Sequence, residues 1–142
     1  MATFKDIFLA YYREVDENGE PVEDSAADVI AHARGLDAVT SYRLSRNIAA
    51  LEKANQMYTE ERNKLIEALG RTEDEDGNEV PAHIPPDDFD TIAAFNERMA
   101  ELMEVEVVDV KWYPVKVSKI NADIPPYVFN RLDWLFEYDA EA

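Results

Sequence analysis

The fold of this chain follows from one uninterrupted stretch, Val39 to Leu69, which reads VTSYRLSRNIAALEKANQMYTEERNKLIEAL. It contains no glycine or proline, and Gly70 follows at the position expected for a helix cap. One series of positions repeats at intervals of four and three residues, which places them on one face of an α-helix. This seam consists of Leu44, Ile48, Leu51, Asn55, Tyr58, Arg62, Leu65 and Leu69. The pattern predicts a single helix of about 46 Å, at ~1.5 Å per residue.

Two positions of the seam are polar, Asn55 and Arg62. One interpretation is that the seam is hydrated there, with the stem of Arg62 along the groove and its guanidinium in solvent. The other is that Asn55 is buried and fixes the register or the partner number of packed helices, as a buried asparagine does in coiled coils. We therefore treat Asn55 and Arg62 as candidate specificity positions of the seam.

The length of 142 residues predicts one domain, 1–142, with N-terminal helices and a loop in 1–36, a helical hairpin in 37–104 and a β-element and final helix in 105–142. The absence of cysteine excludes disulfides and thiolate chemistry. No apolar run approaches the ~20 residues of a membrane span, so no membrane association is expected. The N-terminus lacks the pattern of a signal peptide.

Two short helices are predicted before the long one. Thr3 and Asp6 form a capping pattern ahead of an amphipathic run that continues to Tyr12. Residues 14–24 are polar and contain an Asn18-Gly19 turn, which indicates a loop or small hairpin. Ser25 then opens a second short helix, which Gly35 closes.

A second seamed helix is predicted from Asp87 to Met103. Residues 71–86 form a long connection with turn chemistry at Asp76-Gly77-Asn78, and Pro85-Pro86 precedes acidic residues that favour a helix start. The apolar positions of this helix repeat at helical spacing: Ile92, Phe95, Met99 and Leu102. Two connected seamed helices pack most simply as an antiparallel hairpin.

The pattern changes to a period of two after Val105. Apolar residues alternate with polar ones through Trp112, and again after Pro114, which predicts two short strands or one kinked strand within 105–120. Pro126 favours the start of a final helix that runs through Phe136. The expected fold class is α+β and mainly α: a long helical hairpin with short N-terminal helices, a small β-element and a C-terminal helix.

The acidic residues are concentrated in one part of the chain. The net charge is −17, and residues 73–109 contain thirteen acidic residues against Arg98 alone. Such a surface repels phosphate, so direct binding of nucleic acid is not expected, and it attracts a basic protein surface. The candidate partner-binding residues are Glu97, Glu101, Glu104 and Asp109. The alternative is that the acidic residues only maintain solubility.

No catalytic or cofactor motif is present. His32 and His83 stand alone, and the sequence contains no HExxH motif, no glycine-rich phosphate loop and no nucleophile elbow. A calcium loop centred on Gly77 fails, because Thr72 and His83 occupy the positions that require acidic ligands. We expect no cofactor, no metal and no enzymatic activity. His32 is expected to be a surface or partly buried structural residue, and His83 to be exposed.

Several short motifs, in order, resemble a group of small proteins from tailed bacteriophages and prophages of Gram-positive bacteria. They are Ser41-Tyr-Arg-Leu44, Leu51-Glu52, Glu60 to Ile66, Gly70, Glu75-Asp-Gly-Asn78, Phe95-Asn-Glu97 and Val105-Glu-Val107. The resemblance covers roughly Val39 to Asp109 and, more weakly, the C-terminal helix, whereas residues 1–36 depart from the pattern. It implies a phage origin, with a location in the host cytoplasm or the virion, and assigns no functional residues.

Two functions fit these features best, ahead of a third, weaker interpretation as a small enzyme or metal-dependent factor. The first is a phage accessory protein that acts by protein–protein interaction in virion or tail assembly, with a protein partner or a second copy of itself on the seam or on the β-element. The second is an acidic inhibitor of a host defence or nucleic-acid enzyme, whose carboxylates stand where DNA phosphates would. The identity of the partner would separate the two.

Overall fold

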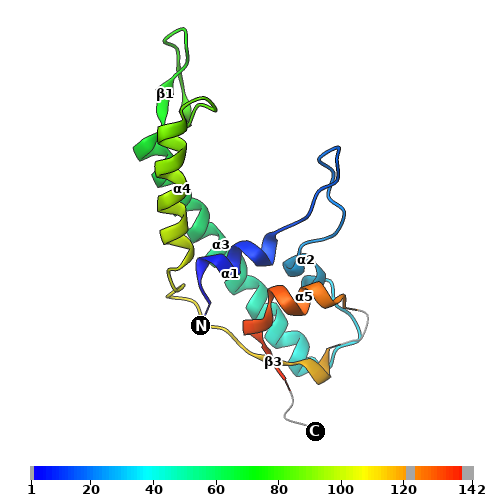
Figure 1. The fold of residues 1–142 in the computed structure, drawn as a ribbon. Coiled ribbons are helices and arrows are strands. Elements are labelled where there is room, and N and C mark those ends of the chain that lie inside the picture. Colours follow the sequence, from blue (N-terminus) through cyan, green and yellow to red (C-terminus); the bar gives the residue numbers. More distant parts are fainter. Residues whose placement is uncertain (1, 121–123, 139–142) are drawn as a thin grey trace.

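A computed structural model describes residues 2–120 and 124–138 (Figure 1). Its elements are α1 (Phe4–Tyr11), α2 (Ala26–Ala31), α3 (Ala38–Leu69), β1 (Arg71–Glu73), β2 (Glu79–His83), α4 (Phe89–Met103), β3 (Val115–Lys116), the 3₁₀ turn η1 (Val117–Lys119), α5 (Pro126–Arg131), the 3₁₀ turn η2 (Asp133–Leu135) and β4 (Phe136–Glu137). The molecule is mainly helical, as the sequence predicted.

The long helix α3 is the axis on which the other elements are arranged (Figure 1). Its first turn is capped by Asp37, whose carboxylate accepts a hydrogen bond from Thr40 N at 2.8 Å. Its end is fixed by Gly70, which has an ordinary extended backbone. A Cβ at Gly70 would lie 2.5 Å from the carbonyl oxygen of His83 and 2.6 Å from that of Ile66. Glycine is therefore needed there because two backbones approach closely.

The first half of α3 belongs to a packed body, which we define as residues 2–58 together with the described residues after 104. Helices α1, α2 and α5 gather around this half of α3 (Figure 1). The predicted caps are confirmed: Thr3 and Asp6 form a reciprocal capping box on α1, and Ser25 caps α2. The turn at Asn18-Gly19 is also confirmed, with Gly19 in the left-handed region at φ 78°. The first residues of α1 and α2 are therefore fixed by local hydrogen bonds.

The buried stripe of α3 differs from the predicted seam in register. Its buried residues are Thr40, Leu44, Asn47, Leu51 and Ala54. Leu44 and Leu51 are common to both series, but the buried amide is Asn47, whereas Asn55 is only partly buried. The stripe also ends at Ala54, whereas the predicted seam continues to Leu69. An apolar period fixes a face of the helix to within one position, and the packed neighbours decide which of the adjacent residues is enclosed.

The second half of α3 projects from the body together with α4 and the connecting hairpin (Figure 1). We call residues 59–104 the arm. Helix α4 is capped by Asp88, whose carboxylate accepts from Thr91 N at 3.3 Å, and it runs back along α3. The predicted helical hairpin is therefore confirmed. None of the residues of the arm is fully buried, so its two helices share only a partly covered apolar seam.

The connection between the two helices contains a β-hairpin that the sequence analysis described only as a turn. Strands β1 and β2 pair antiparallel, with Arg71 opposite His83 and Glu73 opposite Glu79. The turn is confirmed: the Asp74 carboxylate accepts from Asp76 N and Asn78 N, both at 2.9 Å, and Gly77 has φ 81°. The strands were missed because β1 is exposed throughout and has no apolar alternation.

The β-element in 105–120 is smaller than predicted. Residues 108–112 form no strand, and only Val115–Lys116 does. The extended segment lies instead along α3, where side chains of the helix bind its backbone. Asn47 Nδ2 donates to Tyr113 O at 2.7 Å, and Asn47 Oδ1 accepts from Tyr113 N at 2.8 Å. A buried side-chain amide thus replaces the neighbouring strand that a backbone of this shape requires.

The C-terminal helix is also shorter than predicted. Helix α5 ends at Arg131, and the chain continues through η2 into β4, which pairs in parallel with β3. Of the four apolar residues that predicted a continuous helix, Leu132, Leu135 and Phe136 are buried and Phe129 is partly buried. The spacing identified three residues of the core but was wrong about the backbone, because a 3₁₀ turn has a period close to that of an α-helix.

Candidate interaction surface

The arm carries most of the negative charge of the molecule. Residues 59–104 contain fourteen acidic and four basic residues, a net charge of −10 out of −17 for the chain. Glu97 and Glu101 are exposed on α4, and Glu104 is exposed at its C-cap. Because they are spaced four and three residues apart, the three carboxylates lie on one side of the helix. The arm therefore presents an acidic face that points away from its apolar seam.

Asp109 lies on a different element from the three glutamates. It is exposed in the extended segment after α4 and has φ 66°, the one positive φ among the described non-glycine residues. Its carbonyl oxygen accepts from Lys53 Nζ at 3.0 Å. This bond holds the backbone of the segment against α3 and leaves the carboxylate in solvent. Asp109 therefore adds charge beside the acidic face but is not part of it.

The two predicted seam positions contribute little to packing. Asn55 is partly buried, and Arg62 is exposed. Arg62 lines a hollow of about 290 Å³ near the tip of the arm, together with Ile66, Ala82, His83, Ile84, Ile92 and Phe95. His83 is partly buried there, with its ring Nδ1 3.1 Å from Pro81 O, so the expected exposure of this histidine is wrong. His32 is exposed, and its Nδ1 lies 2.8 Å from Asp28 O.

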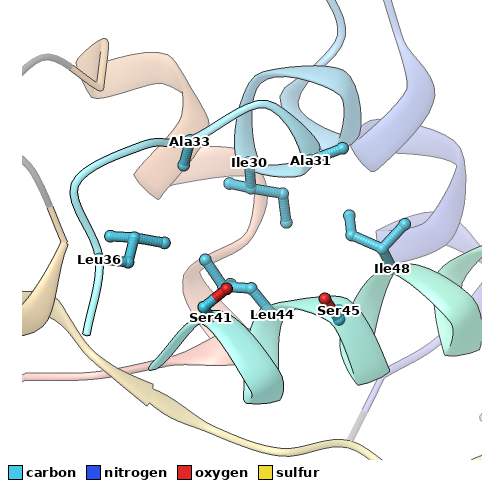
Figure 2. Close-up of a pocket in the computed structure, with 8 residues that line it drawn as sticks. All are labelled: Ile30, Ala31, Ala33, Leu36, Ser41, Leu44, Ser45 and Ile48. Atoms are coloured by element: carbon cyan, nitrogen blue, oxygen red, sulfur yellow. The ribbon is translucent and has the colours of Figure 1, made fainter. Parts of the chain in front are cut away.

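A small hollow of about 190 Å³ lies between α2 and the start of α3 (Figure 2). Its walls are Ile30, Ala31, Ala33, Leu36, Leu44 and Ile48, with Ser41 and Ser45 as the polar members. A serine needs a neighbouring base to act as a nucleophile, and no ionisable side chain lines this hollow. The hollow is therefore a packing feature between two helices and offers no acid–base chemistry.

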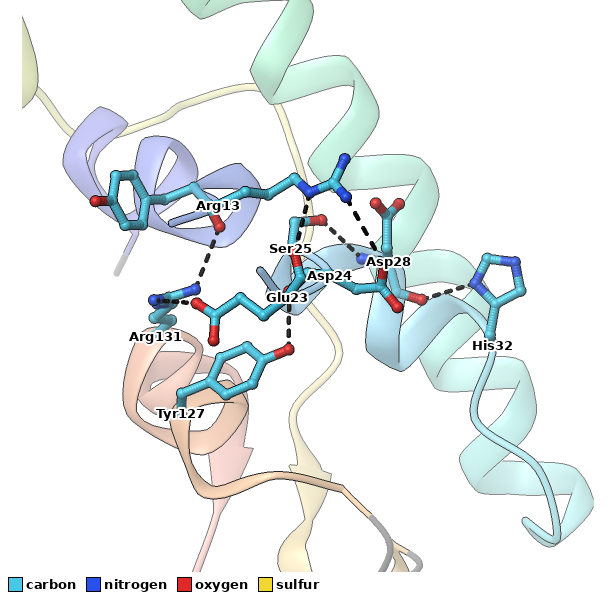
Figure 3. Close-up of polar contacts among 9 residues, drawn as sticks. Arg13, Glu23, Asp24, Ser25, Asp28, His32, Tyr127 and Arg131 are labelled. Carbon is cyan, nitrogen blue, oxygen red and sulfur yellow. Dashed lines mark hydrogen bonds and ion pairs between the residues drawn. The ribbon is translucent and has the colours of Figure 1, made fainter. Parts of the chain in front are cut away.

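A cluster of charges ties the C-terminal helix to the N-terminal region (Figure 3). Arg131 pairs with Glu23 at 2.9 Å, and its side chain is only 15% exposed. The guanidinium also donates to Tyr12 O at 3.2 Å and lies 4.8 Å from the centre of the Tyr127 ring. Tyr127 in turn donates to the carbonyl oxygen of Asp24 at 2.8 Å. The side chains of Arg131 and Tyr127 thus both have partners in the N-terminal region, which indicates that the cluster stabilises the fold.

The carboxylates with shifted pKa values do not have the shift that a catalytic acid requires. Hydrogen bonds from Thr40 lower the pKa of Asp37, those from Asn78 lower that of Asp74, and those from Thr91 lower that of Asp88. A catalytic acid needs a shift in the opposite direction. Within residues 2–120 and 124–138, no group of three or more His, Asp or Glu side chains could hold a metal ion.

A larger cavity, of about 470 Å³, lies where the arm joins the body. We call it the junction cavity, and it is lined by Phe4, Met57, Glu60, Glu61, Leu102, Val105, Glu106 and Val108. The cavity could not be predicted from the sequence, because its walls come from α1, α3, α4 and the segment after α4. The signal in the sequence was the pair Val105 and Val108, two large apolar residues within an acidic stretch.

No helix in the described part of the chain is long and apolar enough to cross a membrane. Comparisons of the chain with known protein families, with characterised proteins and with solved structures find no match.

Proposed function

We propose that this is a non-enzymatic protein that acts by binding another protein with its arm. The observation that supports the proposal is a difference in burial between the two helices. Helix α4 contains no buried residue, although its apolar seam is as regular as that of α3. A two-helix arm with a half-open seam and an acidic outer face is a surface typical of helical protein–protein interactions. The resemblance to phage proteins favours virion or tail assembly as the setting, in the host cytoplasm or the virion.

A second function has its own supporting observation, the charge of −10 on the arm. An elongated acidic surface can occupy the phosphate-binding site of a nucleic-acid enzyme. The alternative is therefore an inhibitor of a host defence or nucleic-acid-binding enzyme. The two proposals share the arm and differ in the partner and in whether duplex DNA competes for it.

The test is to isolate the partner with the whole protein as bait and then to measure association with that purified partner. The variant Glu97→Gln, Glu101→Gln, Glu104→Gln removes three charges from the acidic face without touching the apolar seam. We expect slower association and a weaker dependence on salt, since steering acts mainly on the on-rate. The matched control is Glu14→Gln, Glu17→Gln, Glu20→Gln in the exposed loop of the body, which removes the same charge from a distant place.

The outcomes separate the two proposals. Binding to a structural phage protein that duplex DNA does not displace supports the assembly function. Binding to a nuclease or another DNA-binding enzyme that duplex DNA displaces supports the inhibitor function. Equal association rates for the wild type, the arm variant and the loop variant would remove the acidic face from both proposals.

A further inference from the structure

We propose that the junction cavity is the anchor point for the partner, and that it binds an apolar side chain flanked by lysine or arginine. This inference rests on the proposed binding function and names the chemistry of the segment bound. It concerns the inner side of the arm, whereas Glu97, Glu101 and Glu104 lie on α4 outside the lining of the cavity.

The apolar wall of the cavity is built by three helices and the segment that follows them. Phe4 comes from α1, Met57 from α3 and Leu102 from α4, and all three pack against the core or belong to it. Val105 and Val108 complete the wall and remain 48% and 57% exposed. When a partner covers large apolar side chains that are exposed beside a cavity, the burial of their surface favours binding. Met57 adds an unbranched, adaptable side chain that can adjust to different occupants.

The rim of the cavity carries three carboxylates, Glu60, Glu61 and Glu106. Glu61 already pairs with Lys64 at 3.0 Å, whereas Glu60 and Glu106 form no ion pair with any of the described residues. Two open carboxylates beside an apolar hollow are complementary to a segment with an apolar residue between cations. A second copy of this chain is disfavoured as the occupant, because it would bring another net charge of −17 to the acidic arm.

The rim is held in place by backbone hydrogen bonds. Phe4 N donates to Val105 O at 3.0 Å, and Val107 N donates to Ala2 O at 2.8 Å, so the segment after α4 pairs with the N-terminal residues. These bonds hold Val105 and Glu106 at the edge of the cavity before any partner arrives. A site that is already ordered loses less conformational entropy on binding.

The probes are three synthetic peptides of twelve residues: one with a central leucine flanked by lysines, one with glutamates in place of the lysines, and one with serine in place of the leucine. The readout is the ¹³C-methyl signal of methionine in the intact protein. Met57 lines the cavity, and Met99, which lies on α4 outside the lining, is the internal reference. We expect the lysine–leucine peptide to shift the Met57 signal and the two control peptides to leave it unchanged.

Substitutions at the rim test the role of charge. Glu60→Gln and Glu106→Gln should each weaken binding of the lysine–leucine peptide by up to about five-fold. Val108→Asn should weaken it by more, because it places a polar amide in the apolar wall. Glu67→Gln, on the exposed side of α3 outside the cavity, is the matched control and should leave the affinity unchanged.

Three results would overturn the inference: no movement of the Met57 signal with the lysine–leucine peptide, an equal response to the glutamate peptide, or a dimer in sedimentation experiments that Val108→Asn dissociates. The proposed function is judged separately, by the association of the isolated partner. If that partner binds and Glu60→Gln, Glu106→Gln and Val108→Asn leave its affinity unchanged, the protein is a binding protein whose anchor lies elsewhere.

Discussion

Leu51 and Leu65 occupy the same seam of the same helix, two heptads apart, in opposite surroundings. Leu51 is 0% exposed in the body, where α1, α2 and the extended segment cover α3. Leu65 lies in the arm, where α3 packs against α4 and β2, and it is only partly buried. Periodicity shows which face of a helix is apolar, but the number of elements packed against it decides how much of that face leaves water.

The largest expected effect is a difference between these two leucines. Leu51→Ala should lower the free energy of unfolding by about 2–5 kcal/mol, because it leaves a cavity in a closed core. Leu65→Ala should cost about 1–2 kcal/mol, since water already reaches part of the side chain and no closed cavity is left. Urea unfolding followed by circular dichroism measures both. Equal costs would mean that the arm is packed as tightly as the body.

The next effect compares two asparagines of α3. Asn47→Leu removes both hydrogen bonds to Tyr113 and leaves the partly buried N–H and C=O of Tyr113 without these partners, so we expect a loss of about 1–3 kcal/mol. Asn55→Leu should leave stability unchanged or raise it slightly, because this amide makes no hydrogen bond within the described residues. Thermal unfolding and sedimentation of both variants decide the matter. A larger loss for Asn55→Leu would restore Asn55 as the residue that fixes the seam.

An alkaline titration tests the body separately from the arm. Burial, followed by the charges of Glu52 and Asp28, raises the pKa of Tyr11 to about 12. A raised pKa stabilises the folded state below pH 10, and this contribution is lost as the pH rises through 12. Near pH 11 the loss is on the order of 1 kcal/mol for a shift of this size. Tyr11→Phe should therefore lose less stability than the wild type between pH 8 and pH 11. Parallel curves would show that the phenol is not enclosed.

The smallest effect on stability is expected in the acidic face. Glu97→Gln, Glu101→Gln, Glu104→Gln removes like charges spaced three and four residues apart on α4, so we expect a gain of a few tenths of a kcal/mol at low salt. The gain should vanish at 1 M salt, where the Debye length falls to about 3 Å. Thermal unfolding at two salt concentrations provides the measurement. A loss of stability would indicate that these carboxylates have partners within the arm.

The helices and their starts could be predicted because their causes are local. Thr3 and Ser25 cap the residues three positions ahead, and helical spacing also placed Glu97, Glu101 and Glu104 on one side of α4. The hydrogen bonds that hold the backbone of Tyr113 could not be predicted from the sequence. They come from the side chain of Asn47, which is 66 residues away, and not from a neighbouring strand. The junction cavity was missed for a related reason. Its walls are distant in sequence, and no period connects Phe4 with Leu102.

The continuity of α3 has a mechanical consequence. One rod of 32 residues, about 48 Å long at ~1.5 Å per residue, is embedded in the core at one end and free of it at the other. It contains no glycine or proline at which it could hinge. A force applied at the tip is therefore transmitted as torque to the core around Leu51, and the arm and the body rotate together as one rigid unit. Whatever grips the arm also sets the orientation of the whole molecule.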